Sequence, residues 1–287
     1  MMKKITSMLL VLLLCFTGIL MVACGATDED ETNDGAGAGT EAASESASEP
    51  STEPSTEPST ENNEEVSKPV LKMVTNAYFA PYEYFEGDKI VGIDADIAAA
   101  IADKLGMELV IESIDFDSII TTVNAGGADF GMAGMTVTDE RLLEVDFTHS
   151  YATGCQMIVV TVDSAITSLD DLTAETKIGV QRGTTGALYA DWDGYNAVEY
   201  ATANEAIIAL KTGAVDCVMI DEAPAENFVA ANAGELKTIE TAYIIENYAA
   251  CVKKGNTELL NKLNDALTAL TLDGTIDAII EKYIPAE

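Results

Sequence analysis

Two hydrophobic periods alternate along the chain from Leu71 onward. Short apolar runs between polar residues predict buried strands, whereas apolar residues spaced three or four apart predict helices. In the clearest helix pattern, Ile93, Ile97 and Ile101 recur every fourth residue, and Gly106 is expected to end the helix. The predicted order is a strand at Leu71–Thr75, a helix at Asp94–Leu105, a strand at Leu109–Ile111, a helix at Ser118–Asn124 and a strand at Ala128–Ala133. This alternation predicts an α/β fold with mostly parallel sheets.

A weak internal repeat relates residues 119–132 to residues 207–219. Each copy has a pair of isoleucines in a helical pattern, then Gly-Ala, then a short apolar strand. Polar residues follow each strand, Gly134–Thr136 in the first copy and Asp221–Glu222 in the second. We therefore expect two α/β lobes of similar build. Ligands bind at the carboxyl ends of strands in open α/β sheets, so two facing ends predict a cleft.

Residues 1–23 are predicted to be an export signal. Lys3 and Lys4 precede an almost wholly apolar run at residues 5–23. A transmembrane anchor is the alternative, but the run is near the lower length limit for a span and no basic cluster follows it. Residues 21–24, Met-Val-Ala-Cys, resemble a lipoprotein lipobox, which implies that Cys24 is lipidated. Two acyl chains on Cys24 would anchor the protein stably to a membrane.

Residues 24–67 are predicted to be a lipidated N-terminus followed by a disordered acidic linker. Glu-Pro-Ser-Thr repeats from Glu49 to Thr60, and such a segment buries too little apolar surface to fold. The formal net charge is −34, with only 15 Lys and Arg among 287 residues. This balance argues against nucleic acid as a partner, because phosphate binding needs basic side chains.

The chain has five cysteines. Beyond the signal and Cys24, three remain, and we expect all of them to be buried free thiols: Cys155, Cys217 and Cys251. No metal-ligand spacing, phosphate loop or Ser/His/Asp set is visible. The sequence therefore predicts no metal, no cofactor and no catalytic residue.

Several motifs, in this order along the chain, resemble the family of extracellular solute-binding proteins for polar amino acids. They are residues 80–84 (Ala-Pro-Tyr-Glu-Tyr), 91–96 (Val-Gly-Ile-Asp-Ala-Asp), 133–141 (Ala-Gly-Met-Thr-Val-Thr-Asp-Glu-Arg), 145–147 (Val-Asp-Phe) and 178–185 (Ile-Gly-Val-Gln-Arg-Gly-Thr-Thr). The resemblance implies a fold like that of type II periplasmic binding proteins, with two doubly wound lobes joined by two hinge strands. It places lobe 1 at 68–150 and 249–287, lobe 2 at 156–243, and the hinge at 151–155 and 244–248. It also implies a monomer that delivers its ligand to an ABC permease in the membrane.

A free amino acid presents a carboxylate, an ammonium group and a side chain. Arg141 is the predicted carboxylate partner, because a guanidinium grips a carboxylate through two parallel hydrogen bonds. We expect it in the first turn of a helix capped by Thr138. The resemblance implies that Asp221 pairs with the ligand ammonium, with Glu222 as the fallback. From the residues alone, a surface arginine and a solvated aspartate remain open alternatives.

Two loops are expected to add backbone and hydroxyl contacts to the ligand. The resemblance assigns this role to Gly134 and Thr136 after one strand, and to Thr184 and Thr185 after another. Thr185 is favoured for the carboxylate, because the N-terminus of a helix offers free N–H groups to an anion. Ordinary turn chemistry is the alternative for all four residues.

The ligand side chain is expected to lie between Phe79 and Phe116, for which core packing is the alternative. Asn76 stands where binders of cationic amino acids carry Asp, so the resemblance favours a small, neutral polar ligand. Gln181 stands where glutamine binders carry Lys, which leaves glutamine itself open. Two other carboxylates are available if the cleft differs from this alignment: Asp96 and Glu83.

Two other classes of function compete with a binding protein. A dehydratase resembling cyclohexadienyl dehydratase would need a general acid or base in the cleft. The single histidine, His149, is expected outside the cleft, which argues against that enzyme. A ligand-sensing ectodomain would need a transmembrane segment and an output domain, and none is expected before the last residue, Glu287.

Overall fold

The structure is a computed structural model that describes residues 67–239 and 244–285. The predicted signal peptide and Cys24 lie outside the described residues, as does the predicted linker except for residue 67. Within the described ranges, no helix is long and apolar enough to cross a membrane.

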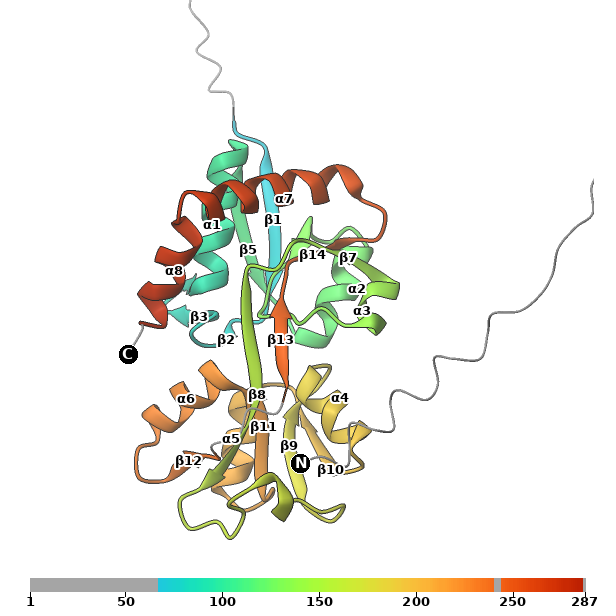
Figure 1. Cartoon of the computed structure of the whole chain (residues 1–287). Coiled ribbons are helices and arrows are strands. Elements are labelled where there is room, and N and C mark those ends of the chain that lie inside the picture. Colours follow the sequence, from blue (N-terminus) through green and yellow to red (C-terminus); the bar gives the residue numbers. More distant parts are fainter. Residues whose placement is uncertain (1–66, 240–243, 286–287) are drawn as a thin grey trace, which may run out of the picture. The chain divides into compact units, whose positions relative to one another are not determined.

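A five-stranded sheet forms the first lobe, with the strand order β5-β1-β6-β14-β7 (Figure 1). The strand β1 is parallel to β5 and β6, whereas β14 is antiparallel to β6 and β7. The strand β14 comes from the C-terminal part of the chain, so the chain returns to this sheet after it has formed the second lobe. The bounds are β1 (Val70–Thr75), β5 (Glu108–Ser113), β6 (Phe130–Gly131), β7 (Val145–Phe147) and β14 (Cys251–Lys253).

Helices cover this sheet through their apolar faces. In α1, Ile93, Ile97 and Ile101 are buried at the four-residue spacing that the sequence predicts. Gly106, at φ +68°, ends α1 in the left-handed conformation, which glycine adopts at little cost. The helix α1 packs against β5, α7 and α8, while α2 packs against β1, β6 and β14. The bounds are α1 (Ile93–Leu105), α2 (Ile119–Asn124), α3 (Asp139–Glu144), α7 (Thr257–Leu272) and α8 (Thr275–Tyr283).

The second lobe has its own sheet, with the order β10-β9-β11-β8-β12. The strand β9 is parallel to β10 and β11, and β8 is antiparallel to β11 and β12. A capping box of Thr202 and Glu205 begins α5, because each side chain accepts a backbone N–H that the helix leaves free. The bounds are β8 (Ala152–Thr161), β9 (Lys177–Gln181), β10 (Asn196–Tyr200), β11 (Cys217–Asp221), β12 (Leu236–Thr238), α4 (Thr185–Trp192), α5 (Ala203–Lys211) and α6 (Glu222–Ala231).

Two antiparallel strands run between the lobes (Figure 1). The long strand β8 pairs with β13 (Ile245–Tyr248), with Cys155 opposite Ile245 and Ala152 opposite Tyr248. The same strand β8 then continues into the second sheet. The predicted architecture of two α/β lobes joined by two hinge strands is therefore confirmed.

A three-stranded antiparallel meander, β2-β3-β4, belongs to the first lobe. It consists of β2 (Tyr78–Phe79), β3 (Glu83–Glu86) and β4 (Lys89–Val91). Its register places Glu83 directly opposite Phe79. Residues opposite each other on antiparallel strands point to the same face, so these two side chains share one side of the meander.

Two elements depart clearly from the sequence prediction, whereas the bounds of β1, α1 and β5 shift by only one or two residues. The strand predicted at 128–133 is only Phe130–Gly131, the two residues that pair with β1 and β14. The helix predicted from Ser118 begins as a 3-10 turn, Phe116–Ser118, before α2. The thiol prediction is confirmed: the cysteines of the described residues are buried and free, and they are Cys155, Cys217 and Cys251.

Candidate functional site

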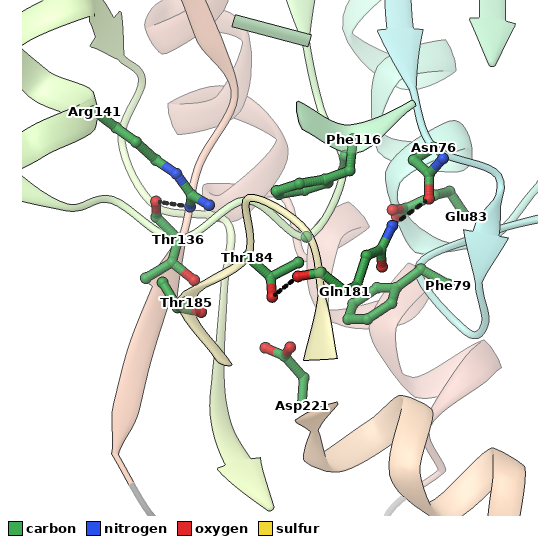
Figure 2. A pocket seen from close by; sticks show the side chains of 12 residues that line it. Asn76, Phe79, Glu83, Phe116, Thr136, Arg141, Gln181, Thr184, Thr185 and Asp221 are labelled. Carbon is green, nitrogen blue, oxygen red and sulfur yellow. Dashed lines mark hydrogen bonds between the residues drawn. The ribbon is translucent and has the colours of Figure 1, made fainter. Parts of the chain in front are cut away.

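One cavity is lined by residues of both lobes (Figure 2). The space free of protein atoms in this cavity, its open mouth included, is about 310 Å³. All ten predicted ligand-binding residues line it: Asn76, Phe79, Phe116, Gly134, Thr136, Arg141, Gln181, Thr184, Thr185 and Asp221. Glu83 and Ala133 line it as well.

The guanidinium of Arg141 is the cation of this cavity. Thr138 caps α3 and accepts a hydrogen bond from the Arg141 backbone N–H, so Arg141 lies in the first turn, as the sequence predicts. Its Nη1 donates to the carbonyl oxygen of Thr136 at 2.7 Å, and its Nη2 donates to that of Gly183 at 2.9 Å. The side chain is only 7% exposed, and among the described residues no carboxylate lies within 4 Å of it.

Burial lowers the pKa of Arg141, but a guanidinium stays charged in proteins. A buried positive charge held only by neutral carbonyl groups is costly unless an anion neutralises it. Its guanidinium carbon lies 5.4 Å from the centre of the Phe116 ring, which adds a modest cation–π attraction. The arrangement therefore favours an anionic group of a ligand at Arg141.

Asp221 is the carboxylate that the second lobe contributes. It is the last residue of β11 and the N-cap of α6, and it is buried. Its carboxylate accepts a hydrogen bond from the hydroxyl of Tyr248, on the hinge strand β13. Burial raises the pKa of Asp221, and the nearby carboxylate of Glu246 raises it further. A cationic ligand group would offset both effects, because an opposite charge favours the ionised carboxylate.

Two loops bring backbone groups to the cavity. Gly134 has φ +52°, which favours glycine, and its N–H donates to Asp94 at 2.8 Å. Thr184 caps α4 and donates its hydroxyl to the Gln181 carbonyl oxygen at 2.7 Å. Thr185 follows as the first residue of α4 and is buried. The N-terminus of α4 therefore faces the cavity beside Arg141, where free N–H groups favour an anion.

Two amide side chains meet across the cavity. Gln181 of the second lobe donates from Nε2 to Oδ1 of Asn76 in the first, at 3.0 Å (Figure 2). The amide nitrogen of Asn76 donates to the carbonyl oxygen of Ile114 at 2.7 Å. Phe79 is buried beside them and stacks on Tyr82, with ring centres 6.1 Å apart. This part of the cavity is polar, and neither of the two amide side chains carries a charge.

The main residue that sequence reasoning left off the site is Glu83. It was considered only as another source of carboxylate, yet it lines the cavity and is 1% exposed. Its register opposite Phe79 was the missing signal, since predicting that hairpin register would have placed both residues together. The other acidic alternatives lie elsewhere: Asp96 is bound to Lys282, and Glu222 accepts a hydrogen bond from Cys155.

The described residues hold no group of three or more His, Cys, Asp or Glu side chains suited to a metal. His149 is exposed and does not line the cavity. Its backbone N–H donates to Asn264 at 2.7 Å. The ionisable groups among the described residues that line the cavity are Arg141, Asp221 and Glu83.

Residues 71–286 match the family described as bacterial extracellular solute-binding proteins, family 3. The chain belongs to this family, and its fold is that of the type II periplasmic binding proteins.

Three known proteins illustrate the similarity. The arginine-binding extracellular protein ArtP of Bacillus subtilis is 33% identical over 223 residues, which cover 76% of this chain and 87% of ArtP. Structures of an ancestral arginine-binding protein are 39% identical. The alignment with the arginine-bound form has a TM-score of 0.70 and covers 75% of this chain and 98% of that protein. The alignment with the glutamine-bound form has a TM-score of 0.72 and covers 76% of this chain and 99% of that protein. The ancestral amino acid-binding protein AncCDT-1, a precursor of cyclohexadienyl dehydratase, is 31% identical with a TM-score of 0.69, covering 75% of this chain and 95% of its own.

Proposed function

We propose that this protein captures a free amino acid outside the cell membrane and delivers it to an ABC importer permease. One observation carries the proposal: a buried guanidinium and a buried carboxyl group, one from each lobe, line the same small cavity. An α-amino acid carries the complementary pair of charges on adjacent groups. The relatives that are named as amino acid-binding proteins support the same ligand class.

In this proposal the ligand carboxylate lies between Arg141 and the N-terminus of α4, where Thr185 offers its backbone N–H and hydroxyl. The ligand ammonium lies against Asp221, and the backbone of Gly134 and Thr136 makes further contacts with the ligand. Each interaction joins a full charge to a buried partner, which makes it strong and directional. The ligand thus contacts both lobes and favours their closed arrangement.

The lobes in this proposal are residues 68–150 with 249–287, and residues 156–243. They close about the crossings at 151–155 and 244–248. The closed form is the state that a permease would recognise, since closure is the change that reports an occupied site. Lipidation of Cys24 would hold the protein near that permease, with residues 24–67 as the tether.

The ligand side chain is placed beside Phe79, Phe116, Asn76 and Gln181. These groups suit a polar, uncharged side chain, because Asn76 and Gln181 carry no charge. Glu83 qualifies this proposal, because a neutral side chain is compatible with Glu83 only while its carboxyl group holds a proton. The names of the relatives include arginine and histidine binders, so a cationic side chain is the alternative.

An enzyme on the same fold is less well supported. Arg141 and Asp221 are assigned to the charges of the ligand, and His149 does not line the cavity. Glu83 is the remaining group that could act as a general acid. A turnover assay with a dehydratase substrate, prephenate, separates this alternative from binding alone.

A thermal-shift screen of the common amino acids tests the proposal. A ligand at about a hundredfold excess over its Kd stabilises the folded state by about 2.7 kcal/mol. For a domain of this size that corresponds to a rise of about 5–10 °C in Tm. We expect such a rise with a small set of amino acids. A screen in which no amino acid raises Tm contradicts the proposal.

A further inference from the structure

Glu83 is a buried carboxyl group without a donor. It is 1% exposed, and neither carboxyl oxygen has a hydrogen-bond partner when Glu83 is ionised. Among the described residues, no Lys, Arg or His forms an ion pair with it. An isolated buried carboxylate of this kind is strongly unfavourable. The group must therefore gain either a proton or a cation.

Asp94, at the start of α1, is its neighbour and is fully buried. One oxygen, Oδ2, accepts from the Gly134 N–H at 2.8 Å and from the Tyr151 hydroxyl at 2.9 Å. The other oxygen, Oδ1, has no donor when both carboxyl groups are ionised. With one proton on Glu83, the two side chains hydrogen-bond to each other. A single shared proton thus satisfies oxygens on both residues.

The surroundings of the pair are acidic. Asp221 faces Glu83 from the second lobe, and the tyrosines next to the pair, Tyr82 and Tyr151, remain neutral because their pKa values are raised by burial. Burial raises the pKa of Glu83 well above its usual value, and the charge of Asp94 raises it further. The pKa of Asp94 is raised to about 7, mainly by burial. The proton shared by the pair is therefore held near neutral pH.

The position of Glu83 in the cavity suggests what replaces this proton. Figure 2 shows Glu83 beside Asn76, on the opposite side of the view from Arg141. Asp221 lies near enough that its charge raises the pKa of Glu83. If Arg141 and Asp221 hold the α-groups, as the proposed function requires, the side chain of the ligand extends toward Asn76 and Glu83.

We propose that Glu83 and Asp94 form a proton-exchanging cation subsite at the side-chain end of the cavity, a proposal that rests on the proposed function. A neutral polar side chain binds with the proton in place. A cationic side chain, guanidinium or ammonium, binds as the O–H bond of Glu83 breaks and the proton passes to solvent. The N–H groups of the ligand side chain then donate hydrogen bonds to the ionised carboxylate of Glu83.

Proton exchange makes ligand charge preference depend on pH. Release of one proton on binding raises the affinity about tenfold per pH unit, as long as the pair is protonated in the free protein. A neutral side chain adds no such slope, and the proton that Asp221 exchanges with the ligand ammonium is common to both kinds of ligand. L-Arginine and L-citrulline are matched probes, because citrulline replaces the guanidinium by an uncharged urea of nearly the same shape.

Titration calorimetry of the purified protein with both probes tests this directly. Binding heats at pH 6.5 in two buffers of different ionisation enthalpy, phosphate and Bis-Tris, give the number of protons exchanged. We expect arginine to release about 0.5–1 proton more than citrulline, since any proton that Asp221 loses to the ligand ammonium is common to both probes. Equal proton release with both probes, or arginine binding without release, overturns the subsite. If neither probe nor any other amino acid binds, the proposed function itself fails.

A variant pair adds an independent test. Glu83→Gln keeps the size of the side chain but removes the exchangeable proton and the negative charge. The ratio of arginine affinity to citrulline affinity should fall at least about tenfold, and the extra proton release with arginine should disappear. Glu86→Gln, on the exposed end of the same strand, is the matched control and should leave the ratio unchanged. An unchanged ratio in Glu83→Gln contradicts the proposal, and the wild-type proton count decides it if that variant does not fold.

Discussion

Arg141 in the first lobe donates a hydrogen bond to the carbonyl oxygen of Gly183 in the second, at 2.9 Å. The same guanidinium donates to the Thr136 carbonyl oxygen in its own lobe. Both acceptors are neutral, so they orient the guanidinium without neutralising its charge. This arrangement couples the position of the lobes to the group that we assign to the ligand carboxylate.

The first prediction concerns this cation. Removing one partner of a buried ion pair costs about 3–5 kcal/mol, because the other charge is left unpaired. Arg141→Ala should therefore weaken amino acid binding at least about a hundredfold. Arg141→Lys should also bind weakly, since an ammonium lacks the two-pronged geometry. Arg182→Ala removes a half-exposed cation nearby and should change the affinity less than about twofold, by calorimetry. Unchanged affinity in Arg141→Ala would refute the assignment.

The second prediction separates two adjacent acidic residues. Asp221→Asn keeps an acceptor for Tyr248 but removes the charge assigned to the ligand ammonium. We expect at least about a tenfold loss of affinity, because a charge-assisted hydrogen bond is lost. Glu222→Gln should have little effect, since this side chain is exposed and does not line the cavity. The opposite ranking of the two variants would move the ammonium site to Glu222.

The third prediction uses close packing at the hinge. A methyl group at Gly154 would collide with the ring and hydroxyl of Tyr248, which binds Asp221. Gly154→Ala should lower the stability by about 1–3 kcal/mol and weaken ligand binding, because Tyr248 must move. Thr153→Ala changes an exposed position on the same strand and is the control. Thermal unfolding and calorimetry measure both effects, and wild-type values in Gly154→Ala would exclude this packing.

The fourth prediction is a pH dependence of the free protein. Glu83, Asp94 and Asp221 all have raised pKa values in the folded state, about 7 for Asp94. Because the folded state binds these protons more tightly, their stabilisation is complete below the unfolded pKa near 4. It is lost as the pH rises through the folded-state pKa values. Exposed carboxylates such as Asp171 have lowered pKa values and do not oppose this trend above pH 5.

Without ligand, Tm should fall between pH 5 and pH 8. A loss of at least about 1 kcal/mol corresponds to about 2–4 °C for a domain of this size. Glu83→Gln should reduce the slope, because its amide does not titrate. Calorimetric scans in a series of buffers measure it, and a Tm that rises over this range contradicts the burial of ionisable carboxyl groups.

The fifth prediction concerns the membrane anchor, which lies outside the described residues. Cys24→Ala should release the protein from the membrane fraction, since the acyl chains supply the attachment. Ligand affinity should stay the same, because the linker separates Cys24 from the lobes. If the variant remains in the membrane fraction, the alternative that residues 5–23 form a transmembrane anchor is favoured instead.

The fold was largely predictable because its signals are local. The isoleucine spacing in α1 and the glycine after it specify a helix and its end without reference to the rest of the chain. The strand β6 was overestimated for the opposite reason. Only Phe130 and Gly131 pair with β1 and β14, and the extent of pairing between strands far apart in sequence is not encoded by a local pattern.

The candidate site was predictable where family motifs carry it and incomplete where it depends on register. Arg141 and Asp221 line one cavity although they are eighty residues apart, because each follows or ends a strand that points to the cleft. A neutral ligand was expected because Asn76 carries no charge, and Glu83 was kept only as an alternative carboxylate. The pairing of Glu83 with Phe79 adds a carboxyl group to the same cavity, and the net charge of that cavity could not be counted without it.

The most direct test of the central claim changes the ligand instead of the protein. Calorimetry with the best amino acid from the thermal-shift screen, its α-carboxamide and its N-acetyl derivative probes both α-groups in unmodified protein. The account predicts that the free amino acid binds and that each derivative binds at least about a hundredfold more weakly, since each leaves one buried charge unpaired. Binding of the carboxamide as tightly as the free amino acid would show that Arg141 does not hold a ligand carboxylate, and the proposed site would be wrong.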